Sequence, residues 1–300
     1  MRFLHTADWH LGRIFYGQYL TDDQAHVLEN QFFSILKEEK IDGILLAGDV
    51  FDRAVPPIEA IELWDSIITR LAMDYKVPLF VVSGNHDGAE RLEVGRSMLS
   101  QSGIHIWGSP HHALQPFEFE GVDGKVAICP MPFSEPRRIG DALGFATPSL
   151  ETGLNLHNYD QMYQAWGNHL RNQVPKGMRS IAISHAFVMG GDVGGSERTL
   201  SIGGSEQVSP QVFKDFHYTA LGHLHGPQRM GADYIRYSGS PLKYSFDEHT
   251  QKKSFTIVDM NTKGQVDIST IPVDAKRNVV ILEGYFEDLL RSEEHTSELQ

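Results

Sequence analysis

The stretch that decides the fold is Asp42-Gly-Ile-Leu-Leu-Ala-Gly-Asp49, a short apolar run that ends in a glycine and an aspartate. A continuous apolar run of this length is typical of a strand buried on both faces of a sheet. Residues 77–83 repeat the pattern and run into Gly84-Asn-His-Asp87. In α/β proteins the carboxyl ends of such strands form one edge of the sheet, where functional sites are built. We therefore expect a site where these strands end.

Strands and helices alternate through the first half of the sequence. Apolar residues recur at helical spacing in 20–40, 58–73 and 89–101, between strand-like runs at 2–7, 42–47 and 77–83. This βαβαβα order predicts a largely parallel sheet covered by helices.

The second half is richer in strands. Gly121-Val-Asp-Gly124 predicts a hairpin between 117–120 and 125–129. A helix is expected at 159–172, and further strands at 179–184, 217–221, 234–238, 254–260 and 266–271. We predict an α/β fold in which two mixed β-sheets are sandwiched between helix layers.

Composition sets broad limits on the class of protein. The chain has 300 residues, 41% of them hydrophobic and 22% charged, as in a soluble globular protein with one large domain or one domain and an appendage. The net charge of −13 does not favour nucleic-acid binding, because phosphate contacts need local positive charge. Bound dications would offset part of that charge.

The single cysteine, Cys129, excludes a disulfide within the chain and is expected to be a buried hydrophobe. No apolar run approaches the length of a membrane span, and the first residues meet a charge too early for a signal peptide. We expect a cytoplasmic protein without membrane contact.

Five polar clusters each follow an apolar run. They are Asp8-Trp-His10, Gly48-Asp49, Gly84-Asn-His-Asp87, Ser184-His185 and Gly222-His-Leu-His225. Each alone has an ordinary structural reading, such as a helix cap, a polar turn or a structural histidine. Asp8 and His10 are two residues apart, so in extended backbone both point to one side. Five independent strand ends that each carry a ligand-competent group favour one site for two divalent ions.

The mixed oxygen and nitrogen ligands suit Mn, Zn or Fe better than Ca or Mg alone. Two ions about 3.5–4 Å apart can activate a bridging water and stabilise charge on a transferring phosphoryl group. No cysteine lies near the clusters, which disfavours a structural zinc site, and no Walker-type loop occurs. Hydrolysis of a phosphate ester is the expected reaction.

The clusters, in this order, resemble the pattern of the calcineurin-like metallophosphoesterase superfamily. Longer segments are similar to the SbcD-type nuclease subunits of bacteria, and the similarity runs from Met1 to about Leu290. These segments are Leu4-His-Thr-Ala-Asp-Trp-His-Leu-Gly12, Gly48-Asp-Val-Phe-Asp52, Ser196-Glu-Arg-Thr-Leu-Ser-Ile-Gly-Gly204, Ala220-Leu-Gly-His-Leu-His225 and Tyr237-Ser-Gly-Ser-Pro-Leu242. The resemblance implies the four-layer sandwich of that superfamily.

The resemblance also implies a role for each matching residue. One metal ion would be held by Asp8, His10, Asp49 and His225, and the other by Asp49, Asn85, His185 and His223. His86 would be a catalytic histidine that is not a ligand. The implied activity is a manganese-preferring exonuclease and endonuclease that cuts DNA ends and hairpins in repair, recombination and replication. Its implied partner is an SbcC-type ATPase with a long coiled coil, and a homodimer is also implied.

The pattern changes after Pro272, with a strand expected at 278–283 and a helix at 285–290. Members of the resembling family continue into a DNA-capping domain and a helical region that binds the partner. We expect a nuclease domain at 1–272 and the start of a truncated capping domain at 273–290, without the docking region. Residues 291–300 match a translation of a common sequencing-adapter oligonucleotide, so we exclude them as an artefact.

Several further residues are weaker candidates. Asp52 and Asp87 would orient the ligands or serve as turn and cap residues. Arg13, Arg53 and Arg91 would contact DNA phosphates or be ordinary solvated arginines.

Two other functions compete with the nuclease. A small-molecule phosphodiesterase or phosphatase would use the same metal centre, although the segments at 196–204 and 237–242 favour the nuclease. A non-catalytic scaffold is disfavoured because no ligand is missing. The glycine-rich stretch 190–204 is either a flexible linker or a mobile active-site loop.

Overall fold

The computed structural model describes residues 1–145, 155–195, 197 and 206–291, and its first sheet has six strands. Their order is β14 (Val266–Pro272), β13 (Ser254–Met260), β1 (Arg2–Thr6), β4 (Gly43–Ala47), β5 (Leu79–Val82) and β6 (Ile104–Trp107). Strands β1, β4, β5 and β6 are parallel, whereas β13 and β14 extend the sheet antiparallel. The predicted parallel sheet is confirmed, with β6 added to it.

The second sheet also has six strands. Their order is β11 (Gln228–Met230), β12 (Ala232–Tyr237), β10 (Tyr218–Gly222), β9 (Arg179–His185), β8 (Gly124–Met131) and β7 (Phe117–Gly121). The central four are parallel, and β7 and β11 are antiparallel edges. Strands β7 and β8 form the predicted hairpin, so both sheets are mixed as expected.

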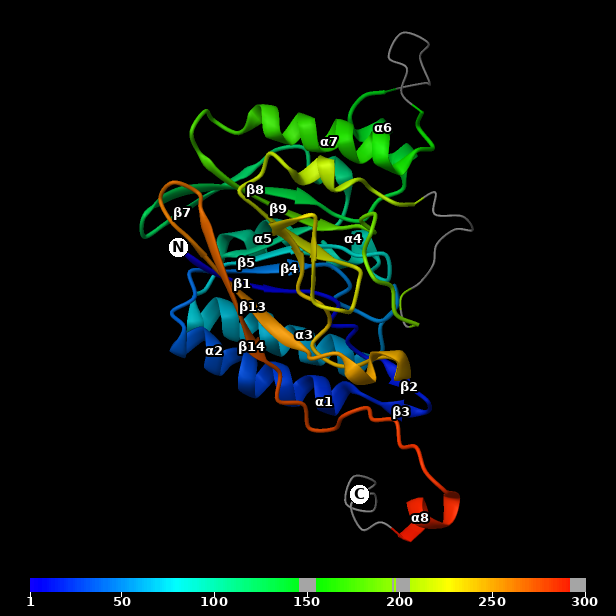
Figure 1. Cartoon of the computed structure of the whole chain (residues 1–300). Coiled ribbons are helices and arrows are strands. Elements are labelled where there is room, and N and C mark those ends of the chain that lie inside the picture. The colour runs from blue at the N-terminus through cyan, green and yellow to red at the C-terminus, as the bar shows by residue number, and fades with distance from the viewer. Residues whose placement is uncertain (146–154, 196, 198–205, 292–300) are drawn as a thin grey trace.

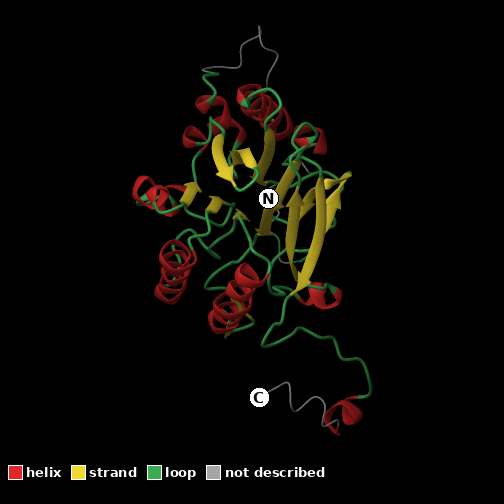
Figure 2. Ribbon diagram, turned by 90° about the vertical axis from the view of Figure 1, so that its left-hand side faces the viewer, coloured by secondary structure: helices red, strands yellow, loops and turns green. Residues whose placement is uncertain are grey.

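Helices cover the outer faces of the two sheets, which gives four layers (Figures 1 and 2). One outer layer holds α1 (Thr21–Ala25) and α2 (Phe33–Glu38), joined by the π-helical η1 (His26–Phe32), and α3 (Ile58–Arg70), extended by η2 (Leu71–Tyr75). The other holds α6 (Pro136–Ala142) and α7 (Tyr159–Gln173). Three single turns of 3₁₀ helix complete the fold: η3 (Pro110–His112), η4 (Pro210–Phe213) and η5 (Phe246–Thr250).

Side chains that alternate along β1 join the layers. Phe3 belongs to the core between the sheets, with Leu45 and Ile128. Leu4 belongs to the core under the α1–α3 layer, with Trp64. Each such buried side chain contributes about 1.5–3 kcal/mol of hydrophobic stabilisation, which fixes the register of β1 between its neighbours.

Two predicted elements differ from the structure. The helix expected at 89–101 is divided into α4 (Ala89–Leu92) and α5 (Arg96–Gln101), because Gly95 adopts a left-handed φ of 75°. The strand expected at 278–283 is wrong, since these residues pair with no strand among those described and lead away from the body toward α8 (Phe286–Arg291) (Figure 1). A strand without a neighbour leaves its backbone groups unpaired.

Three observations complete the comparison with the sequence. Cys129 is fully buried, and burial raises the pKa of its thiol to about 12. Among the described residues no helix is long and apolar enough to cross a membrane. A two-stranded hairpin of β2 (Ile14–Phe15) and β3 (Gln18–Tyr19) was not predicted, because its strands are too short to show alternation.

Candidate metal centre

All seven predicted ligands lie beyond the carboxyl ends of five strands from both sheets. Asp8 and His10 follow β1, Asp49 follows β4, Asn85 follows β5, His185 ends β9, and His223 and His225 follow β10. Asp8, His10 and His185 are fully buried, and Asp49 is 2% exposed. The two sheets therefore meet at one polar cluster inside an otherwise apolar interior.

The backbone is strained where it carries these side chains. Asp8, His10, Asp49 and His223 have positive φ angles of 54°, 47°, 49° and 114°. Residues other than glycine rarely adopt this conformation, and it gathers at functional sites. Backbone hydrogen bonds from Asp8 N to Gly48 O at 3.0 Å and from His10 N to Asp49 O at 2.9 Å hold the two loops together.

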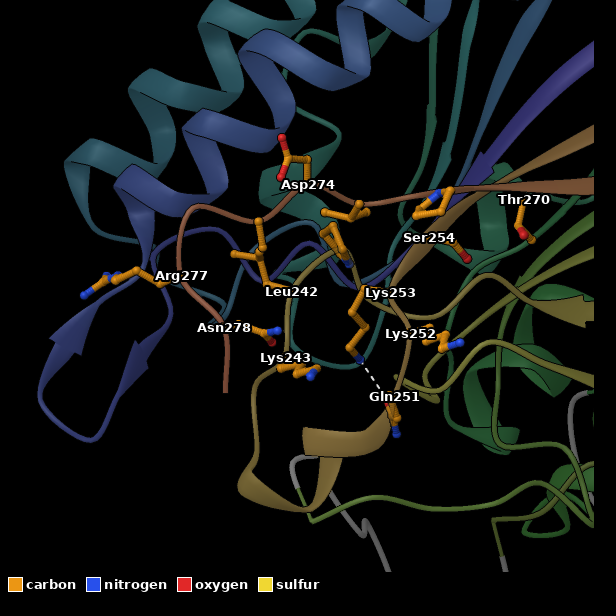
Figure 3. Close-up of a pocket in the computed structure, with 14 residues that line it drawn as sticks. Leu242, Lys243, Gln251, Lys252, Lys253, Ser254, Thr270, Asp274, Arg277 and Asn278 are labelled. Atoms are coloured by element: carbon orange, nitrogen blue, oxygen red, sulfur yellow. Dashed lines mark hydrogen bonds between the residues drawn. The ribbon is translucent and has the colours of Figure 1, made fainter. Parts of the chain in front are cut away.

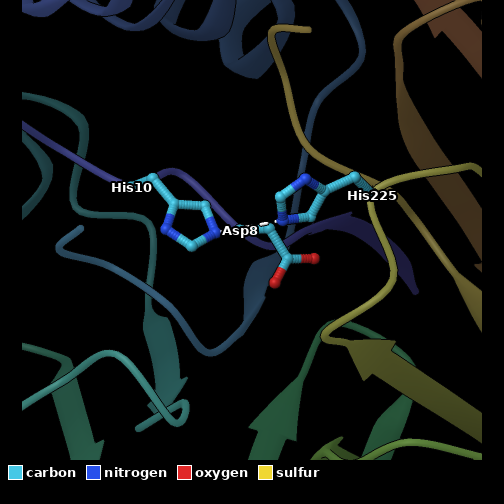
Figure 4. A group of neighbouring side chains, drawn as sticks. All are labelled: Asp8, His10 and His225. Carbon is cyan, nitrogen blue, oxygen red and sulfur yellow. Dashed lines mark hydrogen bonds between the residues drawn. The ribbon is translucent and has the colours of Figure 1, made fainter. Parts of the chain in front are cut away.

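The first group of ligand atoms comprises Asp8, His10 and His225 (Figure 4). The Nε2 atoms of His10 and His225 are 3.1 Å apart, and His10 Nε2 is 3.6 Å from Asp49 Oδ2. The His223 backbone N–H donates to Asp8 Oδ1 at 3.0 Å and so fixes the carboxylate. This group has the size and chemistry to hold one cation.

The second group comprises Asp49, Asn85, His185 and His223. His185 Nε2 is 2.9 Å from Asn85 Oδ1 and 3.5 Å from Asp49 Oδ2. His223 Nδ1 is 3.0 Å from the same Asn85 oxygen. Asp49 faces both groups, as a carboxylate that bridges two ions would.

The protons on His185 test whether a cation fits. Its Nδ1 donates to the Ala47 carbonyl oxygen at 2.9 Å, while its Nε2 faces the Asn85 oxygen. A neutral imidazole carries one proton and cannot donate to both. A cation between Nε2 and Oδ1 would supply the missing positive charge, so these residues fit a bound metal.

Burial sets the charges of the cluster. Burial raises the pKa of Asp8 well above its ordinary value, and the Asp49 carboxylate raises it further. Burial also opposes charge on Asp49, but the imidazoles of His185 and His10 outweigh it and lower its pKa. Burial lowers the pKa of His10 to about 4 and that of His223 to about 3. The rings are neutral at pH 7 and keep lone pairs for a metal.

His86 lies at the edge of the cluster and is 7% exposed. Its Nδ1 donates to the Asp52 carbonyl oxygen at 2.8 Å, and its backbone N–H donates to Asp49 Oδ1 at 2.8 Å. Its ring lies 4.6 Å from that of His10, centroid to centroid. Because Nδ1 is engaged, Nε2 is the ring atom left for a substrate.

Asp52 and Asp87 both brace the loops around the cluster. The Asp52 carboxylate accepts from Arg13 at 2.8 Å and lies 3.6 Å from His10 Nδ1. Burial opposes its charge, but these two partners outweigh burial and lower its pKa to about 2. The Asp87 carboxylate accepts backbone N–H groups of Gly84 and Phe51, and so joins the loops after β5 and β4.

Sequence reasoning missed a buried ion pair behind His225. Glu248 is fully buried, and its Oε1 is 3.2 Å from His225 Nδ1. Lys253 pairs with Glu248 and also donates to the His225 carbonyl oxygen at 2.8 Å. No motif marks either residue; only their burial together reveals them.

Lys253 also lines a pocket of about 460 Å³ formed by residues of 241–243, 251–254 and 270–278 (Figure 3). Its ammonium donates to Gln251 Oε1 at 2.7 Å (Figure 3). The pocket therefore adjoins the ion pair that holds His225.

The three predicted DNA-contacting arginines differ in their surroundings. The Arg13 guanidinium pairs with Asp52 and lies 5.6 Å from the centroid of the Tyr244 ring. Arg91 is exposed and donates to the Ala54 carbonyl oxygen at 2.8 Å, and Arg53 is exposed. All three come from loops that also carry cluster residues or lead from them, and their contact with DNA stays a prediction.

The glycine-rich stretch 190–204 lies largely outside the described residues. Glu197 is described, and its Oε1 accepts the His225 backbone N–H at 2.9 Å. At this one residue the stretch touches the cluster.

Residues 1–227 match the family model of the calcineurin-like phosphoesterases. The chain belongs to this family. Members use a dimetal centre, in keeping with the His and Asp clusters described above. The family makes the chain a phosphodiester hydrolase.

Among characterised relatives, the chain is 33% identical to the SbcD component of the nuclease SbcCD from Staphylococcus epidermidis, over 97% of this chain and 74% of the relative. This confirms the SbcD-type resemblance. A dimetal phosphatase from Danio rerio superposes with a TM-score of 0.51 at 14% identity, over 91% of this chain and 99% of that one. At that identity the similarity shows the fold alone.

Proposed function

We propose that the chain is the nuclease subunit of an SbcCD-type complex, which hydrolyses DNA phosphodiester bonds at ends and hairpins during repair and recombination. The observation that carries the proposal is the 33% identity with an SbcD protein over nearly the whole chain. The buried cluster of two carboxylates, one amide and four imidazoles at the strand ends supports it. The protein would act in the cytoplasm, together with its DNA.

We assign Asp8, His10, Asp49 and His225 to one metal ion. We assign Asp49, Asn85, His185 and His223 to the other, with Mn²⁺ as the expected metal at both. When bound, the two ions supply an activated water and stabilise charge on the phosphoryl group. The chain's own contribution is to hold neutral imidazoles and bridging carboxylates in a buried, fixed geometry.

His86 is the proposed proton donor to the leaving oxygen. Its Nδ1–H is held by the Asp52 carbonyl, so the ring cannot turn away from the centre. Its Nε2 can then carry a proton to within reach of a bound phosphate. Arg53 and Arg91 are exposed beside this histidine's loop partners and are the proposed contacts to flanking phosphates.

The proposed partner is an SbcC-like ATPase with a long coiled coil, as the name of the relative's complex suggests. We place the nuclease domain at 1–272 and the start of a capping domain at 273–290. Residues 278–285 are exposed and lead away from the body, as the beginning of a further domain would. A homodimer is compatible with this arrangement and is part of the proposal.

The test is manganese-dependent digestion of end-labelled DNA by wild type and His86→Ala. We expect the substitution to slow cutting by about a hundredfold or more, as loss of a general acid does. Manganese stoichiometry, measured by calorimetry, should stay at two ions per chain. Unchanged cutting would remove His86 from the reaction.

A second substrate separates the two candidate functions. A phosphatase or small-molecule phosphodiesterase would hydrolyse p-nitrophenyl phosphate or bis(p-nitrophenyl) phosphate without cutting DNA, even with the ATPase present. The nuclease should cut labelled DNA and should lose that activity on treatment with a chelator. DNA left intact in both conditions would favour the small-molecule enzyme.

A further inference from the structure

Three aromatic side chains form an exposed cluster beside the metal centre. Phe15 and Tyr16 come from the β2–β3 hairpin, and Phe246 begins η5. Their ring centroids are 5.0 Å apart for Phe15 and Tyr16, 5.1 Å for Phe15 and Phe246, and 4.8 Å for Tyr16 and Phe246. Tyr16 is 80% exposed and Phe246 is 44% exposed. We call these three residues the aromatic platform.

Both segments of the platform are tied to ligands of the same proposed ion. The hairpin hangs from His10, because Arg13 N donates to the His10 carbonyl oxygen at 3.0 Å just before β2. The helix η5 contains Glu248, which holds His225. The Tyr244 ring lies between, 5.4 Å from the His10 ring and 5.6 Å from the His225 ring. The platform thus flanks the centre on the His10 and His225 side.

The figures agree with this placement. In Figure 1, β2 and β3 lie next to the gold helical turn of η5 at the edge of the α1–α3 layer. The hairpin belongs to neither large sheet, so its strands add nothing to the two cores.

The hairpin turn is strained in order to present an aromatic ring. Tyr16 and Gly17 are its two central residues, with φ angles of 47° and 81°. Turns of this geometry favour Asn-Gly, because residues other than Gly, Asn and Asp resist a positive φ. A tyrosine here lowers stability, and at 80% exposure its ring gains little from burial. Stability of the fold therefore does not explain this residue.

We propose that the aromatic platform stacks an unpaired nucleobase of a DNA strand whose backbone reaches the metal centre. This rests on the proposed nuclease function and names the part of the substrate that the hairpin reads. Every base offers a flat π-face, so stacking on aromatic side chains is strong and tolerant of sequence. Bases inside an intact duplex have no free face, whereas those of frayed ends and hairpin loops do.

Arg13 joins the platform to the centre. It precedes β2 directly, and its guanidinium lies between the Asp52 carboxylate and the Tyr244 ring. A strand stacked on Tyr16 would pass this guanidinium on its way to the ligands, which suits a phosphate contact. A small phosphate ester has no base and would not use the platform.

Binding is measured first, by fluorescence anisotropy in EDTA so that no DNA is cut. The probes are a labelled thymidine strand of about 12 nucleotides and a blunt duplex of equal length. We expect Tyr16→Ala and Phe246→Ala each to weaken single-strand binding about tenfold, with a smaller effect on the duplex. Tyr16→Phe keeps the ring and should bind as wild type.

Tyr19→Ala is the matched control, because Tyr19 is on the same hairpin and 68% exposed but outside the platform. It should leave binding unchanged. Tyr16→Asn should raise the Tm while weakening single-strand binding, since asparagine relieves the turn strain but cannot stack as well. A purely structural role for Tyr16 would not give these opposite changes.

Cleavage adds a second readout. With manganese present, Tyr16→Ala should lower the ratio of single-strand cutting to bis(p-nitrophenyl) phosphate hydrolysis about tenfold. Wild-type binding by Tyr16→Ala, an equal loss in Tyr19→Ala, or no single-strand binding by wild type would each overturn the platform. Absence of all phosphodiesterase activity would instead overturn the proposed function, and the binding measured in EDTA would still decide the platform.

Discussion

At the scale of single residues, the centre depends on side chains that no motif marks. Glu248 fixes the Nδ1 side of His225, so that Nε2 faces His10. A carboxylate behind a ligand histidine sets its tautomer and raises its basicity. The buried Lys253 balances the charge of Glu248.

Glu248→Gln should therefore weaken manganese binding at one of the two sites by about 10–100-fold. The other site, which lacks His225, should keep its affinity. Calorimetric titration resolves the two sites, and Glu59→Gln on the exposed face of α3 is the control. Two unchanged affinities would show that Glu248 only fills space.

Gly48 is required by both its backbone and its surroundings. It has a φ of 89°, and a Cβ added there would collide with the His185 ring. Gly48→Ala should lower the free energy of unfolding by about 1–2 kcal/mol through backbone strain alone, with a further cost from displaced His185. Gly177 has a φ of 82° and open space around it, so Gly177→Ala carries only the strain.

Denaturant unfolding of the two variants tests this difference. Gly48→Ala should be the less stable, and it should also lose affinity for one manganese ion because His185 moves. If the two variants match in both measurements, the close approach of Gly48 and His185 has no energetic weight.

At the scale of elements, strand starts are tied together on the side opposite the site. Asp123, in the β7–β8 turn, accepts from Arg179 Nη2 at 2.8 Å at the start of β9. This hydrogen bond is the main cause that lowers the pKa of Asp123 to about 2. The charge of Asp123 thus stabilises the fold above about pH 4 and stops doing so as the pH falls through about 2.

Asp123→Asn should lower the free energy of unfolding by about 1 kcal/mol at pH 7. The difference from wild type should shrink steadily below pH 4, which thermal melts across that range would measure. Asp233→Asn removes a pair in which both partners are highly exposed, Asp233 and Arg229, and should have almost no effect. A gap between Asp123→Asn and wild type that persists at pH 2 would contradict the assignment.

The elements also show where sequence patterns fail. The helix expected at 89–101 breaks at Gly95, where the Glu93 carboxylate accepts from the Gly108 backbone at 2.8 Å. Such a tertiary hydrogen bond has no local signature. The long helix at 20–40 and the strands at 42–47 and 77–83 were predicted because their apolar pattern reports burial directly.

At the scale of the whole molecule, the chain beyond residue 280 is separate from the two cores. Val273 and Ala275 pack on the core under the α1–α3 layer, and Arg277 pairs with Asp23. Val280, Ile281 and Leu282 are 44–49% exposed. Stability should therefore reside in the segment that ends near residue 280.

A chain of residues 1–280 should melt within about 2 °C of the longer one, since little buried area is lost. Its manganese stoichiometry should also be unchanged. Arg277→Ala in the same chain is the comparison that should lower the Tm, because it leaves the 3%-exposed Asp23 carboxylate without that cation. A much lower Tm for the shortened chain would show that the last residues pack on the body.

The sequence by itself determined the two-sheet α/β class, the strand ends and the identity of the clustered ligands. It could do so because buried strands are continuously apolar and because polar residues at their ends stand out against them. Only the tertiary structure decided how those ends converge: Asp49 facing both groups, Glu248 and Lys253 behind His225, and the strained Tyr16 hairpin beside His10. These contacts join residues far apart in the chain, and their burial and strain exist only after the two sheets have packed.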